Sequence, residues 1–237
     1  MNTDVYEKIE EFQPEQAVVY RAMIASGVAS GRKKSRTNPK MDVFVFAYTR
    51  GVAVFDVVQT LACIDAAAAF LKTLIDEKRM VLIVGSQPAA CALVQQFAET
   101  HDFPYITTRW LGGMLTNFKT LSQRIEYFKK LTADKASGAL DKYTKKERLV
   151  FDRLISNMAY SFSGVLGMIE LPHALFVVDA AAHDTAVREA KRLGIPIIAI
   201  MNNDNDPRGI AYPIPANDNT RSSLVWIFDR IEEKLKA

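Results

Sequence analysis

Short apolar runs alternate with amphipathic stretches along most of this chain. Four runs have the length of a strand and cover residues 80–85, 104–107, 174–179 and 195–201. Helical patterns cover about 88–100 and 184–193, with a closing helix from Asn217 or Asp218. Short unbroken apolar runs are typical of strands buried on both faces. Strands that alternate with helices predict a parallel, doubly wound α/β sheet with right-handed crossovers.

Two further segments extend this body. Residues 212–215 predict an edge strand, because their two prolines are poorly tolerated in a central strand. Upstream, residues 42–48 and 52–55 predict a small hairpin, which an Ala-rich helix over about 56–77 follows. The predicted sheet domain comprises residues 42–113 and 164–237.

Residues 114–163 break the alternation. One apolar stripe recurs at spacings of 3 or 4 and consists of Leu115, Phe118, Leu121, Ile125, Phe128 and Leu131. A second helix is indicated by Leu149, Val150, Leu154, Ile155 and Met158, after a polar break over 133–142. Facing stripes of this kind predict an antiparallel coiled-coil hairpin inserted into the sheet domain, with basic outer faces.

Charge is strongly segregated along the chain, although its net value is only +3. Residues 22–41 carry five basic residues and no acid, and residues 103–148 carry ten basic residues against four acids. The remainder is therefore acidic, and most of the first twenty residues' charges are carboxylates, including Asp4, Glu7 and Glu15. Basic segments on an acidic body are the electrostatic footprint of a protein that binds a polyanion.

Other features limit the class of protein. The apolar runs are shorter than the ~20 residues of a membrane-spanning helix, and the acidic start resembles neither a signal nor a transit peptide. We therefore expect a soluble protein that is not secreted and has no membrane partner. Cys63 and Cys91 stand in apolar surroundings without ligand spacing, which indicates core thiols.

Candidate small-molecule chemistry is sparse. The segment 85–88 follows a strand and opens a helix, so it could cradle a phosphate, but it lacks the spacing of a phosphate-binding loop. Asp179, Asp204 and Asp206 could hold a divalent cation, whereas 202–207 more simply forms a turn-rich loop. His101, His173 and His183 share no spacing, and capping or surface positions explain them. No cofactor, metal site or catalytic residue is predicted.

Cationic residues are the stronger candidates for a binding site. The predicted phosphate-binding residues are Arg32, Lys33, Lys34, Arg36, Lys40, Arg109, Lys119, Arg124, Lys129 and Lys130. The first five lie in a segment with Gly, Ser and Pro, which cannot be a charged helix face and predicts a flexible basic arm after the acidic start, over residues 1–41. Trp110 could stack on a base or pack the joint below the hairpin, and Gly112-Gly113 predicts a sharp turn into the hairpin.

The run 107–120, which reads Thr-Thr-Arg-Trp-Leu-Gly-Gly-Met-Leu-Thr-Asn-Phe-Lys-Thr, is similar to the signature of one family. Together with 38–41, 143–147, 172–196 and 206–207, it makes the chain resemble the bacterial and organellar ribosomal protein S2 family. The resemblance implies a flavodoxin-like sheet domain with a coiled-coil hairpin. It also implies a non-catalytic structural role in the small ribosomal subunit, bound to ribosomal RNA beside other ribosomal proteins.

The chain departs from that family at one place. Where the family usually reads Gly-Val-His-Phe-Gly-His, residues 27–32 read Gly-Val-Ala-Ser-Gly-Arg, so both histidines are absent. The basic residues from Arg32 onward could replace their contacts with phosphate binding. We expect a bacterial cytoplasmic ribosome, with an organellar ribosome as the other location. The alternatives are a flavodoxin-like nucleotide-binding domain or enzyme, and a protein-only adaptor that uses the apolar stripe.

Overall fold

A five-stranded parallel sheet forms the centre of the computed structural model, which describes residues 14–236. Its strands are β4 (Val81–Val84), β5 (Tyr105–Ile106), β6 (Ala174–Val178), β7 (Ile197–Met201) and β8 (Tyr212–Pro215), in the spatial order β5-β4-β6-β7-β8. In chain order this is 2-1-3-4-5, the doubly wound, flavodoxin-like arrangement. The predicted sheet is therefore confirmed, with β8 at one edge.

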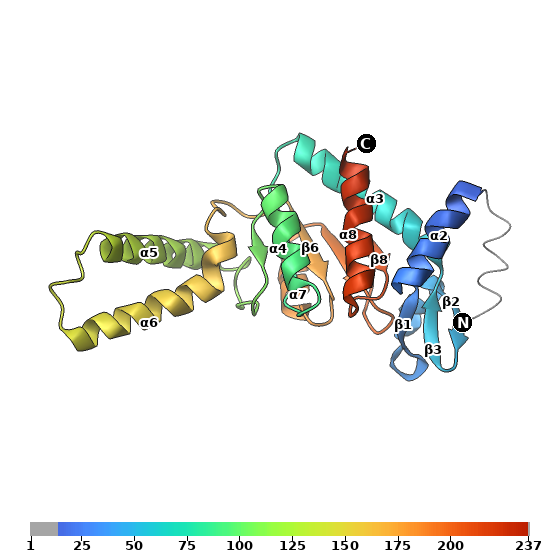
Figure 1. Cartoon of the computed structure of the whole chain (residues 1–237), viewed down its shortest axis with the longest axis horizontal. Helices are drawn as coiled ribbons and strands as arrows, with labels where there is room; N and C mark the ends of the chain where they lie inside the picture. The colour runs from blue at the N-terminus through green and yellow to red at the C-terminus, as the bar shows by residue number, and fades with distance from the viewer. Residues whose placement is uncertain (1–13, 237) are drawn as a thin grey trace.

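Helices cover both faces of this sheet (Figure 1). The helices are α3 (Val57–Asp76), α4 (Cys91–Thr100), α7 (Asp184–Leu193) and α8 (Arg221–Lys236). One core joins the strands to α3, α4 and α8, for example through Leu71, Phe97 and Phe228. The other core lies on the opposite face and joins the strands to α7 and to the base of the hairpin.

A second, three-stranded antiparallel sheet has the order β1-β3-β2, with β1 (Ser30–Lys33), β2 (Val45–Thr49) and β3 (Val52–Phe55). The predicted hairpin is β2-β3. The prediction of a flexible basic arm is wrong for its centre, since β1 pairs with β3 and is followed by short 3-10 turns at Lys34–Arg36 and Pro39–Phe44. Helix α2 (Pro14–Ser26) precedes β1. The acidic residues 1–13 lie outside the described residues.

Two long helices, α5 (Phe118–Ala136) and α6 (Lys145–Phe162), project from the sheet domain side by side (Figure 1). The predicted helical hairpin is present, while its coiled-coil packing stays a prediction. Leu121, Ile125 and Phe128 of the predicted stripe are buried. The loop between the two helices was predicted over 133–142, whereas α5 continues to Ala136 and the loop begins after it. Thr144 and Glu147 form a capping box that starts α6.

Helix α3 corrects one expectation. By length and composition alone it could cross a membrane, since its 20 residues have a mean hydropathy of 1.5 over the most apolar window. However, Ile64, Leu71 and Leu74 are buried in the core with α8. An apolar helix that packs between other elements in this way is a core helix of the sheet domain.

Candidate nucleic-acid interface

Exposed cations lie along the hairpin. Lys119, Arg124, Lys129 and Lys130 of α5 are all exposed, on the sides that the buried stripe leaves free. Lys129 pairs with Glu126 at 3.1 Å, while Lys119, Arg124 and Lys130 form no ion pair with any residue between 14 and 236. Unpaired, exposed cations on a rigid helix keep their full capacity to neutralise phosphates.

The segment after β1 contributes a second exposed group. Lys33, Lys34, Arg36 and Lys40 are exposed, and the Lys34 ammonium lies 4.8 Å from the centre of the Tyr48 ring. Pairing of β1 with β3 holds Lys33 beside Val52. These cations are therefore presented from an ordered surface and not from a flexible arm.

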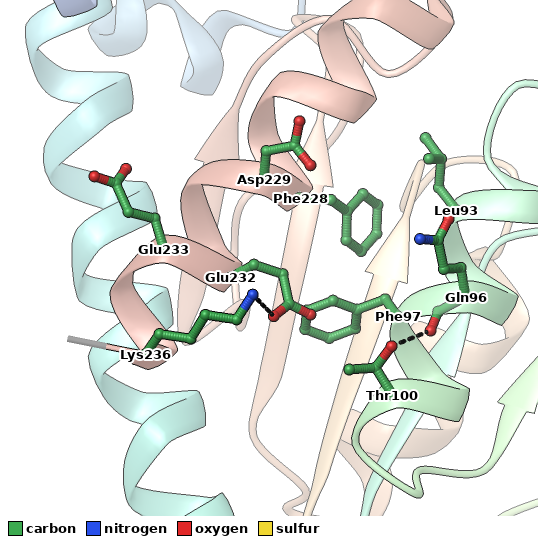
Figure 2. A pocket seen from close by; sticks show the side chains of 9 residues that line it. All are labelled: Leu93, Gln96, Phe97, Thr100, Phe228, Asp229, Glu232, Glu233 and Lys236. Atoms are coloured by element: carbon green, nitrogen blue, oxygen red, sulfur yellow. Dashed lines mark hydrogen bonds and ion pairs between the residues drawn. The ribbon is translucent and has the colours of Figure 1, made fainter.

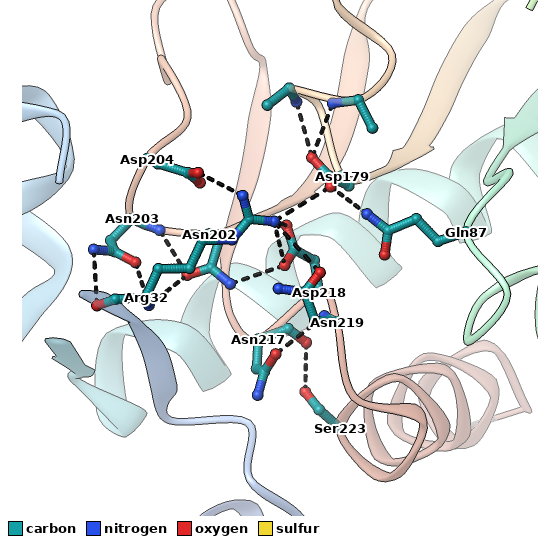
Figure 3. Close-up of polar contacts among 12 residues, drawn as sticks. Arg32, Gln87, Asp179, Asn202, Asn203, Asp204, Asn217, Asp218, Asn219 and Ser223 are labelled. Carbon is teal, nitrogen blue, oxygen red and sulfur yellow. Dashed lines mark hydrogen bonds and ion pairs between the residues drawn. The ribbon is translucent and has the colours of Figure 1, made fainter. Parts of the chain in front are cut away.

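Arg32 differs from its neighbours because carboxylates surround its guanidinium (Figure 3). Its Nη1 lies 2.5 Å from Asp204 Oδ2, and its Nη2 lies 3.4 Å from Asp179 Oδ2 and 3.3 Å from Asp218 Oδ1. Only 20% of the side chain is exposed. The predicted phosphate contact of Arg32 needs correction, since its charge is already neutralised inside the domain and the group is poorly placed to meet RNA.

Asparagine side chains complete this network, which we name the Arg32 cluster: Arg32, Asp179, Asn202, Asn203, Asp204 and Asp218. The backbone N–H of Arg32 donates to Asn203 Oδ1 at 2.6 Å and to Asn202 Oδ1 at 3.1 Å. Asn202 Nδ2 in turn donates to Asp218 at 2.8 Å. The loop after β7 was predicted to bond its own backbone, but its side chains mainly fasten β1 to the sheet.

The candidate cation site is not assembled. Asp179 and Asp204 both contact Arg32, whereas Asp206 forms a separate pair with Arg208 at 2.5 Å. Between residues 14 and 236, no group of three or more His, Cys, Asp or Glu residues is placed to hold a metal ion. The Arg32 guanidinium lies between Asp179 and Asp204, where the sequence had suggested a divalent cation.

Asp218 is the most perturbed carboxyl group of the cluster. Burial raises its pKa to about 6 and nearby Asp179 adds to the rise, although Asn202 and Arg32 oppose it. The closing helix, predicted to begin near this residue, begins only at Arg221. Asp218 therefore serves the cluster from the loop before α8.

Protonation of Asp218 gives a testable pH dependence. Its pKa in the native state lies above the ordinary value of 3.8, so the protein binds this proton more tightly when folded. The resulting stabilisation is complete below about pH 4 and is lost as pH rises through about 6. We expect the unfolding free energy of the wild type, relative to Asp218→Asn, to fall by about 2 kcal/mol between pH 4.5 and 7.5. Urea titrations at pH 4.5, 6 and 7.5 would measure it, and a constant difference would contradict the assignment.

The strand-to-hairpin joint is organised by one buried carboxylate, Glu189 of α7. Its Oε1 accepts from Trp110 Nε1 at 3.1 Å and from the Gly113 N–H at 2.8 Å. Its Oε2 accepts from the N–H groups of Leu115 and Thr116, at 3.0 and 3.1 Å, and from the Thr116 hydroxyl at 3.1 Å. Burial raises the pKa of Glu189, but the hydrogen bonds from Gly113, Thr116, Trp110 and Leu115 outweigh it and lower the pKa. The carboxylate is thus held in its charged form.

These contacts decide the role of Trp110. The indole is 9% exposed and belongs to the core on the hairpin side of the sheet, so it packs the joint. Gly113 has a φ of +89°, which confirms the predicted sharp turn at this residue. Sequence reasoning missed Glu189. Its position three residues after Ala186, on the buried side of α7, was the available signal.

One groove is unsuited to RNA. A cavity of about 400 Å³ lies between α4 and α8, and Figure 2 shows its lining. Phe97 and Phe228 form its apolar floor, and its charged residues are Asp229, Glu232, Glu233 and Lys236. His101 Nε2 lies 2.8 Å from Glu232 at the same place. Three carboxylates against one ammonium repel a polyanion, so this groove is not a candidate nucleic-acid interface.

The fold and the exposed cations together define a flavodoxin-like α/β protein with an inserted basic helical hairpin. The family model described as Ribosomal protein S2 matches residues 23–236, and the chain belongs to that family. It is a structural protein of the small ribosomal subunit and acts in translation, within a ribonucleoprotein. The family is one of structural proteins, associated with ribosomal RNA and other ribosomal proteins.

Proposed function

We propose that this protein binds small-subunit ribosomal RNA directly, through two groups of exposed cations. The observation that carries the proposal is that these cations are exposed and mostly unpaired, whereas Arg32, in the same basic stretch, is enclosed by carboxylates. The proposed contact residues are Lys33, Lys34, Arg36, Lys40, Arg109, Lys119, Arg124, Lys129 and Lys130.

We assign different roles to the sheet domain and to the hairpin. The sheet domain, residues 42–113 and 164–237, supplies a rigid support, and the hairpin over 114–163 reaches outward from it (Figure 1). The acidic groove between α4 and α8 suits a neighbouring ribosomal protein better than RNA, because Asp229 and Glu233 are exposed beside an apolar floor. We place the protein in a bacterial cytoplasmic ribosome, with an organellar ribosome as the alternative.

Reversing charge after β1 tests the proposal. The variant Lys33→Glu, Lys34→Glu, Arg36→Glu should bind small subunits depleted of this protein at least tenfold more weakly, because three phosphate contacts are lost and replaced by repulsion. Sedimentation binding assays at several salt concentrations would measure it. The slope of log affinity against log salt should decrease by about 2.

A matched control carries the same charge change elsewhere. Lys78, Lys191 and Arg192 are exposed and lie outside both basic segments, so their reversal to Glu should leave affinity within about twofold of the wild type. Both variants should unfold near the wild-type temperature, since the changed residues are exposed. Equal losses of affinity in the two variants would mean that only net charge matters, and the proposed contact surface would be wrong.

A further inference from the structure

A second cavity, of about 440 Å³, opens at the carboxyl ends of β4, β5 and β6. Its lining includes Ser86 after β4, Thr107 and Arg109 after β5, and His183 after β6. From β4 the chain passes to β5 on one side, and its next strand, β6, lies on the other side of β4. Doubly wound sheets bind their ligands at this switch point. We name this cavity the switch-point crevice.

Donor groups gather around the switch-point crevice without partners. The guanidinium of Arg109 and the hydroxyls of Thr107, Thr108 and Thr185 form no side-chain hydrogen bond with any residue from 14 to 236. The first turn of α7 also lines it, and its N-cap residue His183 makes no side-chain capping bond. Asp179 Oδ1 already accepts from the N–H groups of Ala181 and Ala182 just before α7. The remaining donors are a cation, three hydroxyls and the first turn of α7, which together favour a bound anion.

The hydrogen bonds of His183 make Ser86 Oγ an acceptor in the switch-point crevice. Its Nδ1 lies 3.0 Å from the backbone oxygen of Asp179, which can only accept, so Nδ1 carries the proton. Its Nε2 therefore accepts from the Ser86 hydroxyl at 3.0 Å and from the Ser86 N–H at 3.3 Å. Because Ser86 donates its hydroxyl proton to the imidazole, its Oγ lone pairs stay available for a hydroxyl donor of the ligand.

An aromatic side chain borders the switch-point crevice from the hairpin. Tyr160 of α6 lines the cavity, yet 68% of its surface is exposed, and it has no hydrogen-bond partner among residues 14–236. Asp184 is the nearest carboxylate in sequence to the lining residues of α7, and Arg188 pairs with it at 2.8 Å. An exposed aromatic ring beside groups that bind an anion is an arrangement that can hold a base and its phosphate.

We propose that the switch-point crevice binds one unpaired nucleotide of an RNA strand. Arg109 and the start of α7 hold its phosphate, Ser86 Oγ accepts from the ribose 2′-hydroxyl, and the Tyr160 ring stacks on the base. This inference rests on the proposed RNA binding and deepens it. It assigns base stacking and ribose recognition, which charge neutralisation alone does not provide.

The test uses the full-length protein, an adenosine hexaribonucleotide, the matching hexadeoxyribonucleotide and AMP. Tyr160→Ala should weaken hexaribonucleotide binding about tenfold, with little change in salt dependence, because it removes stacking and no charge. Arg109→Gln should weaken binding about as much and decrease the salt slope by about 0.7. Tyr127→Ala, at another exposed aromatic of the hairpin that does not line the switch-point crevice, is the control and should bind as the wild type does. Ultraviolet irradiation should cross-link Tyr160 to the RNA.

The outcomes separate the two proposals. If Tyr160→Ala binds the hexaribonucleotide like the wild type and forms no cross-link, the crevice proposal is wrong, and the salt-sensitive association with subunits can still stand. Equal affinity for the deoxyribonucleotide would remove the role of Ser86 and contradict ribose recognition. Saturable AMP binding without RNA binding would mark a site for a free nucleotide and overturn the RNA assignment. If wild-type association with subunits is insensitive to salt, direct RNA binding through cations fails.

Discussion

Replacing Glu189 by Ala should lower the unfolding free energy by about 4 kcal/mol. The carboxylate accepts five hydrogen bonds, of which three come from backbone N–H groups at the start of the hairpin. Leu115 and Trp110 are buried, so their donors cannot turn to water when the acceptor is lost. Each unsatisfied buried donor costs about 1–3 kcal/mol, which makes the sum large even after local relaxation.

Urea unfolding of the purified protein, followed by circular dichroism, would measure this loss. Glu189→Gln should lie between the wild type and Glu189→Ala, because one amide oxygen can still accept while the amide nitrogen faces donors. Glu170→Ala is the matched control, since Glu170 is exposed and has no partner among residues 14–236. A loss below 1 kcal/mol for Glu189→Ala would show that the joint is held by packing alone.

Glu189 also shows where sequence reasoning reached its limit. The periodicity of α7 and the glycine turn could be predicted locally, and packing the joint was one of the two roles predicted for Trp110. Glu189 lies 73 to 79 positions further along the chain than its hydrogen-bond partners in the run 107–120. The tertiary arrangement of β6 and α7 brings it to them. Contacts of that separation leave no local pattern beyond a charge on a buried helix side.

The central strands could be predicted from their apolar residues, whereas β1 could not, because it has none. The central strands are continuous apolar runs, such as Val81–Val84 and Ala174–Val178, so composition and length were sufficient. Strand β1 reads Ser-Gly-Arg-Lys and has no apolar signal. The extended conformation of β1 depends on its pairing with β3 and on the Arg32 cluster, and both involve residues that are distant in sequence.

Among the candidate binding residues, the sequence predicted charge but not its surroundings. Arg32 and Lys33 are adjacent and chemically similar, yet the first side chain is enclosed and the second is exposed. The register of β1 against β3 shifts between Ser30 and Lys33, and the two side chains face different sides of the strand. One of the two sides meets the carboxylates of the β6 and β7 loops, which only the tertiary structure brings together.

The Arg32 cluster supplies the second large effect. Arg32→Ala should destabilise the protein by about 3–5 kcal/mol, because removing one partner leaves buried charge uncompensated. Asp179 and Asp218 have side-chain exposures of 5% and 0%, so water cannot replace the guanidinium there. Since Arg32 lowers the pKa of Asp218, its loss should also move that pKa further upward. The pH-dependent loss of stability should then extend to higher pH than in the wild type.

A double-mutant cycle isolates this interaction. Asp218→Asn in the Arg32→Ala background should restore about 1–2 kcal/mol, because it removes one of the repelling carboxylates. Lys33→Ala is the control, with an adjacent cation on the exposed side of β1 and an expected change within 0.5 kcal/mol. Urea titrations at pH 7.5 would provide all four free energies. Additive changes would mean that Arg32 and Asp218 are not coupled, and that β1 is held by its backbone pairing with β3.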